Sequence, residues 1–178
     1  PIDLGLLAWV ALAPLIAYSI RAEKGWRMFL VSWLAGWCYN AAAFYWLGTT
    51  APAAPFLLAI YKAFYFGFFA LFTRILTRRM PVAISAPVVW LALEYVRAHL
   101  LTGLPWLLLG YSQHEFLAVI QCADLLGVWL VSAIVILANA AVARGIVLWG
   151  EKKVLMRDGE FRASIGAAAM TITLASAY

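Results

Sequence analysis

The sequence predicts an all-α membrane protein, a polytopic bundle of transmembrane helices. Of its 178 residues, 66% are hydrophobic and only 12% are charged, whereas a soluble domain is about half apolar and about a quarter charged. A molecule of this size cannot hide so much apolar surface inside itself, so hydrocarbon must surround much of it. The apolar residues form long runs without the alternation of barrel strands, which favours helices. Scarce charge excludes a disordered chain, and two cysteines exclude a disulfide scaffold.

A membrane-spanning helix needs about 20 mostly apolar residues, and the chain holds six such runs. We therefore expect residues 1–178 to form a single transmembrane domain with about six spans. The runs lie at residues 4–20, 28–47, 56–76, 82–100, 117–143 and 163–178. Because the chain starts with Pro1 and apolar runs reach both of its ends, we expect it to be a piece of a longer protein. The first run has no basic leader and carries Asp3, which argues against a signal peptide.

The connectors between the runs alternate in charge. Residues 48–55 and 102–116 contain no Lys or Arg, whereas the connectors after the first, third and fifth runs hold 11 of the 13 basic residues. By the positive-inside rule the basic connectors are cytoplasmic, and the sixth run then ends on the outer face. The net charge of +5 is thus a topology signal, and we expect no nucleic-acid partner. These 11 residues are Arg21, Lys24, Arg27, Arg74, Arg78, Arg79, Arg144, Lys152, Lys153, Arg157 and Arg162.

A few aromatic and charged residues lie inside the second, third and fourth runs, and each could have a structural or a functional role. Aromatic residues such as Tyr45 and Trp46 at the outer end of the second run favour an interfacial belt. For Lys62 in the third run, a long side chain that reaches the interface is favoured over a substrate role. Glu94 and Arg97 lie three residues apart on one helical face, which predicts an ion pair with a structural or a functional purpose.

The stretch 101–116 is neither a plain helix nor a polar loop. Gly103 and Pro105 break the helix, and the residues that follow are too apolar to leave the membrane surface. We expect a re-entrant or interfacial segment that lines a cleft open to the outer leaflet, where His99 and His114 could titrate. Asp124, in the fifth run, is expected to face the same outer cavity.

The last connector and the last run have contrasting compositions. Residues 144–162 are strongly polar and predict a solvated cytoplasmic loop. The sixth run is rich in Ala, Ser and Gly, and small residues allow helices to approach closely, so this run is expected to pack inside the bundle.

Signatures of soluble enzyme chemistry are missing from the sequence. The two His and two Cys residues share no metal-ligand spacing, and there is no glycine-rich phosphate loop or nucleophile elbow. Cys38 and Cys122 lack the basic neighbours that activate a nucleophile, so both are interpreted as packing residues. Residue chemistry alone thus predicts a polytopic inner-membrane protein with an outward-facing cleft.

Three ordered motifs resemble the signature of bacterial apolipoprotein N-acyltransferases. The run 86–97 is similar to the helix of that family that reads Trp-x-x-x-Glu-(aromatic)-x-Arg. It is followed by Leu-Thr-Gly-Leu-Pro-Trp at 101–106 and by Leu-Gly-Tyr-Ser-Gln at 109–113. Shorter similarities occur in the segments 1–3, 44–47 and 123–128.

The resemblance implies an enzyme that this chain represents only in part. The family has eight spans and a periplasmic nitrilase-like domain between the seventh and eighth, so the six runs correspond to the second through seventh spans. The domain's Glu, Lys and Cys transfer an acyl chain from a phospholipid to the N-terminal diacylglyceryl-cysteine of a lipoprotein. None of the three is present here, so the resemblance implies no catalytic residue in this chain, no metal or cofactor, and an inactive fragment.

The expected role is to hold the phospholipid acyl donor and the lipoprotein acceptor in the bacterial inner membrane, at a cleft that faces the periplasm. In this interpretation Arg97 is a candidate for binding a lipid phosphate and Glu94 for orienting Arg97. An alternative is a small inner-membrane transporter or assembly partner in which Lys62, Glu94, Arg97 and Asp124 line a path. The expected substrate-binding residues are Glu94, Arg97, Trp106, Gly110, Tyr111, Ser112 and Gln113.

Overall fold

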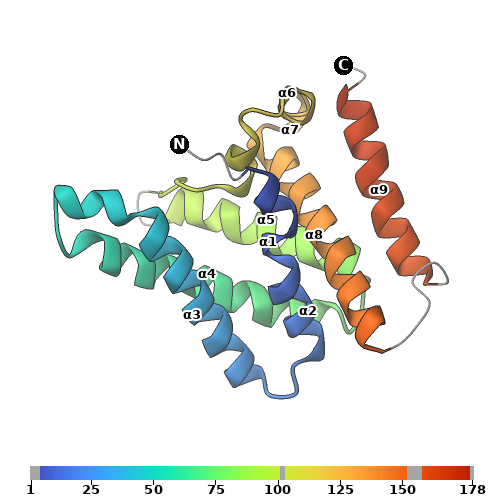
Figure 1. The fold of residues 1–178 in the computed structure, drawn as a ribbon, viewed down its shortest axis with the longest axis horizontal. Coiled ribbons are helices and arrows are strands. Elements are labelled where there is room, and N and C mark those ends of the chain that lie inside the picture. The colour runs from blue at the N-terminus through green and yellow to red at the C-terminus, as the bar shows by residue number, and fades with distance from the viewer. Residues whose placement is uncertain (1–4, 101–102, 152–157, 177–178) are drawn as a thin grey trace.

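Every regular element that the computed structural model describes, in residues 5–100, 103–151 and 158–176, is a helix (Figure 1). Two of them, α4 and α8, have 23 residues each and are long and apolar enough to cross a membrane. Each is about 34 Å long, against about 30 Å of hydrocarbon. In chain order the elements are η1 (Gly5–Leu7), α1 (Ala8–Ala11), α2 (Ala13–Arg21), α3 (Gly25–Ala43), η2 (Tyr45–Thr49), α4 (Ala54–Leu76), α5 (Val82–His99), η4 (Leu109–Gln113), α6 (Leu117–Ile120), α7 (Ala123–Leu126), α8 (Val128–Gly150) and α9 (Gly159–Ser176).

The all-α class expected from the sequence is confirmed, and the surface is consistent with a helical membrane protein. Large apolar side chains are exposed along α3, α4 and α5, among them Leu34, Phe64 and Val88. A soluble monomer seldom exposes so continuous an apolar surface. Residues 1–4, 101–102, 152–157 and 177–178, which include Asp3, Lys152, Lys153 and Arg157, lie outside the described part of the chain.

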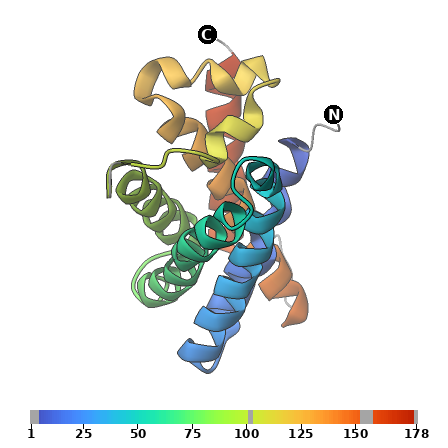
Figure 2. The same ribbon diagram turned by 90° about the vertical axis from the view of Figure 1, so that its left-hand side faces the viewer.

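Helix α8 packs against α1, α2, α5 and α9. Helices α3 and α4 form an antiparallel pair, joined by η2 at the end that faces the viewer in Figure 2. The core lies between α2, α4, α5 and α8, where Ile16, Phe69, Trp90 and Ile136 are buried together. The rings of Phe69 and Trp90 meet edge to face at 4.9 Å, a geometry that aromatic pairs favour.

The first apolar run is broken where one continuous helix was expected. Pro14 has no N–H, so the helix cannot continue its ladder there, and the chain divides at Leu12 into α1 and α2. Asn139 of α8 compensates for the break. Its Oδ1 accepts from the Leu12 N–H at 2.8 Å, and its Nδ2 donates to the carbonyls of Ala8 and Val135 at 2.7 and 2.8 Å.

The fifth run, expected at 117–143, is also divided, and its long helix is displaced toward the C-terminus. Gly127 has a φ of +66°, which glycine adopts without the steric cost that other residues incur, and it separates α6 and α7 from α8. Because α8 continues to Gly150, Arg144 lies inside a helix. The expected polar loop 144–162 is therefore shorter than predicted.

Helix α9 lies along one outer side of the molecule, so the expectation that this run packs inside the bundle was wrong (Figure 1). It contacts α8, α6 and α5 on one face only. Ser164 and Ala168 are buried there, whereas Gly166, Ala167 and Met170 are exposed. The small residues permit close approach, but within the described residues only one side of α9 has helices to approach.

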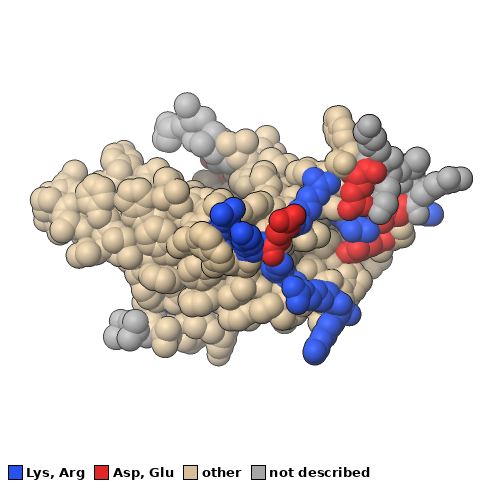
Figure 3. All heavy atoms as spheres, turned by 90° about the horizontal axis from the view of Figure 1, so that it is seen from below, with Lys and Arg blue, Asp and Glu red and all other residues tan. Residues whose placement is uncertain are grey.

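Charged side chains gather at one end of the bundle, as the sequence pattern predicts. Figure 3 shows Lys, Arg, Asp and Glu crowded over one part of this face, beside a broad uncharged surface. The elements that meet at this end are those joined by the basic connectors: α2 and α3, α4 and α5, and α8 and α9. We call it the basic end.

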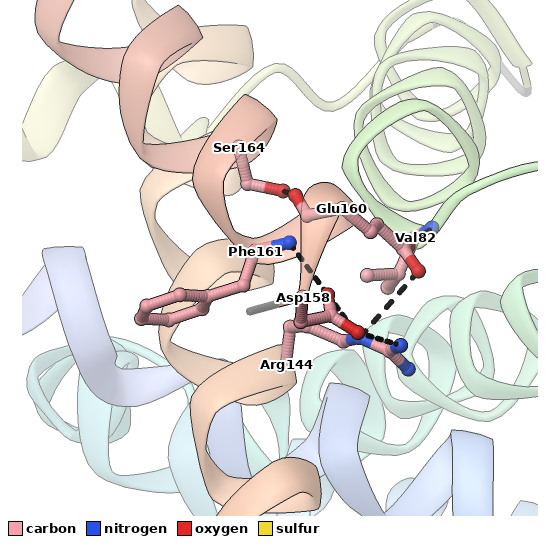
Figure 4. Close-up of polar contacts among 6 residues, drawn as sticks. All are labelled: Val82, Arg144, Asp158, Glu160, Phe161 and Ser164. Carbon is pink, nitrogen blue, oxygen red and sulfur yellow. Dashed lines mark hydrogen bonds and ion pairs between the residues drawn. The ribbon is translucent and has the colours of Figure 1, made fainter. Parts of the chain in front are cut away.

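A polar clasp joins three helices at the basic end (Figure 4). Arg144 of α8 binds Asp158 with two nitrogens, at 3.2 and 2.7 Å, and lies 3.5 Å from Glu160. Asp158 also accepts from the Phe161 N–H in the first turn of α9, and Glu160 accepts from the Val82 N–H at the start of α5. The clasp thus caps two helix N-termini while it pairs three charges.

The clasp makes stability depend on pH in a defined range. The Arg144 guanidinium, with help from the Phe161 N–H, holds the pKa of Asp158 below its ordinary value of 3.8. A lowered pKa in the folded state adds stability above about pH 4, and this is lost as the pH falls through the folded value. We expect Asp158→Asn to destabilise the protein by about 0.5 to 1 kcal/mol near neutral pH.

Thermal unfolding of both proteins in detergent, measured across pH, tests this expectation. The amide keeps the acceptor for Phe161 but removes the charge. The difference between the two proteins should be constant above about pH 5 and shrink toward about pH 3. An undiminished difference at the acidic end would show that Asp158 acts through something other than its charge.

Candidate functional site

The stretch after α5 is held by buried cations that bind its backbone. The Lys62 ammonium donates to the Trp106 carbonyl at 2.5 Å, and Arg97 donates to the Leu107 carbonyl at 3.2 Å. Leu107 itself has a φ of +55°, which is uncommon for a residue with a side chain. Two charged donors on consecutive carbonyls offset the cost of that conformation. We call residues 103–116 the anchored segment.

Two further contacts fix the next turn of the anchored segment. A Glu94 carboxylate oxygen accepts from the Leu109 N–H at 2.7 Å, and the Ser132 hydroxyl of α8 accepts from the Gly110 N–H at 2.9 Å. Gly110 lies so close to α8 that a Cβ there would be 2.7 Å from both Cγ2 and the carbonyl oxygen of Val128. Glycine is required at this position because the two backbones approach each other closely.

The expected ion pair between Glu94 and Arg97 is present and buried. Their charged groups are 3.5 Å apart, and the side chains are 2% and 4% exposed. The Arg97 guanidinium carbon also lies 5.9 Å from the centre of the Tyr65 ring. Among the described residues, Arg97 Nε and the second oxygen of Glu94 have no hydrogen-bond partner.

Lys62 does not extend to the interface as predicted. Its side chain is fully buried, and its ammonium lies 4.8 Å from the centre of the Phe44 ring as well as on the Trp106 carbonyl. Buried charge in an apolar bundle needs compensation, and here a backbone carbonyl and an aromatic face supply it. The expectation failed because the carbonyl comes from a segment 44 residues away in sequence.

Two of the predicted site residues present aromatic rings to the surroundings. Trp106 and Tyr111 are 45% and 53% exposed. The Trp106 ring lies 6.1 Å from that of Trp46, which is 49% exposed, and 6.2 Å from the buried ring of Phe44. The anchored segment therefore keeps its polar backbone inside while it directs large rings outward. We call Phe44, Trp46 and Trp106 the aromatic cluster.

The other predicted site residues are turned inward. Gln113 is fully buried, accepts from the Trp9 indole N–H at 2.8 Å and donates to the Gly5 carbonyl at 3.1 Å. The Ser112 hydroxyl donates to the Leu109 carbonyl at 2.6 Å and accepts from Gln113. These two side chains tie the anchored segment to itself and to the start of the chain.

The remaining candidates are on the surface. Asp124, His99 and His114 are exposed. Lys62, Glu94 and Arg97 are buried on the anchored segment, whereas Asp124 is exposed.

The two cysteines differ in their surroundings. Cys122 is buried as predicted, and burial raises the pKa of its thiol, whereas Cys38 is exposed and is not the packing residue expected. Within the described residues, no three His, Cys, Asp or Glu side chains are placed to hold a metal ion together.

Sequence reasoning missed Ser132 and Asn139, the two buried polar residues of α8 that bind the anchored segment and the broken first run. A signal for them was present. They are seven residues apart, so they lie on one face of an otherwise apolar helix. Asn40 is also buried, and its amide donates to the Gly36 carbonyl of its own helix.

Comparison with known proteins finds one family. A family model described as the apolipoprotein N-acyltransferase N-terminal domain matches residues 1–141. The apolipoprotein N-acyltransferase of Geobacter metallireducens is 37% identical over 152 residues, which cover 78% of this chain and 29% of that protein. Those of Rhodopirellula baltica and Photobacterium profundum are 29% and 31% identical, and the matches cover 84% and 83% of this chain and 28% and 29% of theirs. The chain spans less than a third of the length of these curated relatives.

Proposed function

Because this chain belongs to the apolipoprotein N-acyltransferase family, we propose that it is part of the membrane-embedded portion of such an enzyme. In this role it holds lipid substrates beside the anchored segment while an acyl chain passes from a phospholipid to the N-terminal diacylglyceryl-cysteine of a lipoprotein. The acyl-transfer chemistry itself belongs to other parts of the enzyme. On this proposal residues 1–178 alone bind lipid but transfer no acyl group.

The observation that carries the proposal is the way the anchored segment is built. Four of its backbone polar groups, at Trp106, Leu107, Leu109 and Gly110, are bonded to buried side chains of α4, α5 and α8. Bonds of this kind allow irregular backbone to lie at membrane depth. Its Trp106 and Tyr111 rings face outward. A rigid backbone with exposed rings suits a surface on which acyl chains and lipid headgroups meet.

Glu94 and Arg97 take a different role from the one first expected. Direct binding of a lipid phosphate by Arg97 would need an accessible guanidinium, but this side chain is 4% exposed and is engaged with Leu107 and Glu94. We assign both residues, together with Lys62, to positioning the anchored segment. The rings of Trp106 and Tyr111 then contact the lipid.

The proposal also includes an orientation of the helical bundle in the membrane. About six spans cross the bacterial inner membrane, with the basic end in the cytoplasm and the anchored segment, as an interfacial or re-entrant segment, at the periplasmic side. The gathering of charge at the end opposite the anchored segment supports this, since positively charged connectors favour the cytoplasm. The short helices α6 and α7 lie beside the anchored segment at the outer interface.

Replacement of Trp106 tests the proposal. In a chimera, residues 1–141 of this chain replace the matching region of the Geobacter metallireducens relative. We expect Trp106→Ala to slow acyl transfer from a fluorescent phospholipid to a diacylglyceryl-cysteine peptide by about tenfold, a barrier increase of about 1.4 kcal/mol. The physical reason is the loss of an exposed ring that orients lipid above a fixed backbone.

Tyr45→Ala is the matched control, because Tyr45 is an exposed aromatic residue of η2 next to Trp46. It should leave transfer close to the rate of the unmodified chimera. If the two substitutions slowed acyl transfer equally, Trp106 would act only as a general interfacial anchor. A chimera that inserts into membranes but transfers no acyl chain would contradict the proposed function.

A further inference from the structure

A pocket lies at the basic end, on the opposite side of the bundle from the anchored segment. It has a volume of about 340 Å³ and is bordered by α2, the α4–α5 connector, α8 and the start of α9. One part of its lining is apolar and another is charged. The residues that line it are Ile20, Thr77, Arg79, Met80, Pro81, Val82, Arg144 and Glu160.

Of the three charged residues in this lining, Arg79 is the one available to a ligand. Arg144 is occupied by Asp158 and Glu160, as Figure 4 shows. Glu160 in turn accepts from the Val82 N–H and lies beside the Arg144 guanidinium. The Arg79 side chain is exposed and forms no ion pair with a described residue. Its guanidinium can bind a phosphate with two parallel hydrogen bonds.

The surrounding charge favours an anionic ligand. In the described part of the chain, the basic end carries eight Lys and Arg residues against four Asp and Glu residues. Positive charge concentrated at a membrane surface attracts anionic lipids over distances of about a Debye length. The apolar lining supplied by Ile20, Met80 and Val82 suits the glycerol and upper acyl region of a lipid rather than a small soluble anion.

We propose that this pocket binds the headgroup of an anionic phospholipid of the cytoplasmic leaflet, with the phosphate on Arg79 and the upper part of the lipid on Ile20, Met80 and Val82. This site goes beyond the proposed function, because it lies at the other end of the bundle from the substrate region. A lipid bound there contacts α2, α8 and the start of α5 together. It therefore adds to the contacts that the Arg144 clasp makes between α5, α8 and α9.

Native mass spectrometry of the chain released from nanodiscs with equal amounts of phosphatidylglycerol and phosphatidylcholine tests this proposal. We expect the first lipid retained to be mainly phosphatidylglycerol. Arg79→Ala should reduce that preference about fivefold, the effect expected of one basic residue at an anionic lipid surface. Arg79→Lys should keep only part of it, since the charge remains but the paired hydrogen bonds of the guanidinium are lost.

Arg78→Ala is the matched control, because Arg78 is a neighbouring exposed arginine outside the pocket lining. Equal losses in the Arg78 and Arg79 variants would assign the preference to the diffuse charge of the basic end and overturn the site. A wild-type chain that retained both lipids equally would also overturn the site. Excess inorganic phosphate should leave the preference for phosphatidylglycerol intact. If phosphate abolished this preference, the pocket would be a site for free anions. Both side chains are exposed, so neither alanine variant should change the thermal unfolding midpoint.

Discussion

Arg97→Ala is expected to lower the free energy of unfolding by about 3 to 5 kcal/mol, the largest loss of any single substitution considered for this chain. The substitution leaves the Glu94 carboxylate buried without its cation, and it removes the donor that holds the Leu107 carbonyl. The buried carboxylate would then keep its bond from the Leu109 N–H but lack a counter-charge, and the Leu107 carbonyl would lack its donor. Reversible unfolding in mixed micelles, followed by circular dichroism, gives the quantity directly.

A double substitution separates the cost of unpaired charge from the loss of packing. Glu94→Gln together with Arg97→Met removes both charges while keeping side chains of similar size. Replacing a buried ion pair as a unit costs less than removing one partner. We expect the double variant to be more stable than Arg97→Ala. A double variant at least as unstable as the single one would mean that the bonds to Leu107 and Leu109 carry the stability, rather than charge pairing.

Gly110→Ala is the second substitution with a large expected effect. The added Cβ would meet Val128 at 2.7 Å on both a side-chain and a backbone atom, so the anchored segment must move away from α8. Overpacking of this kind costs about 1 to 3 kcal/mol. The shift also weakens the bond from the Gly110 N–H to Ser132.

Hydrogen exchange of the backbone amides in η4 measures this displacement. We expect the Gly110 and neighbouring amides to exchange faster in Gly110→Ala, because their partners are pulled apart. Gly166→Ala is the control, since nothing lies within 4 Å of a Cβ at that position in α9. It should leave exchange in η4 unchanged and stabilise α9 slightly. Unchanged exchange in Gly110→Ala would show that α8 can accommodate the methyl group.

The residues of the site that could be predicted are those with local causes. Glu94 and Arg97 are three residues apart on one helix, so their pairing follows from helical geometry alone. Gly103 and Pro105 likewise indicate the end of α5. The contact of Lys62 with Trp106 has no local signature, because a backbone carbonyl is present at every position and only the path of the chain selects one.

The fold was predicted well in class and less well in its interruptions. Hydropathy finds long apolar runs, but it does not register a missing N–H at Pro14 or a positive φ at Gly127. Both residues are visible in the sequence as helix breakers. The sequence did not indicate that Asn139 would bond to the Leu12 N–H and the Ala8 carbonyl at the first break. These bonds allow the break to persist in an apolar environment.

The bonds from Asn139 to the first run also constrain the order of events during synthesis. Leu12 leaves the ribosome 127 residues before the side chain that satisfies its N–H. At about 5 to 20 residues per second, this is a delay of roughly 6 to 25 s. During that interval the α1–α2 junction must keep its free N–H in water, in the insertion machinery or on a temporary partner. The N-terminal segment therefore reaches its final position only after α8 has been made.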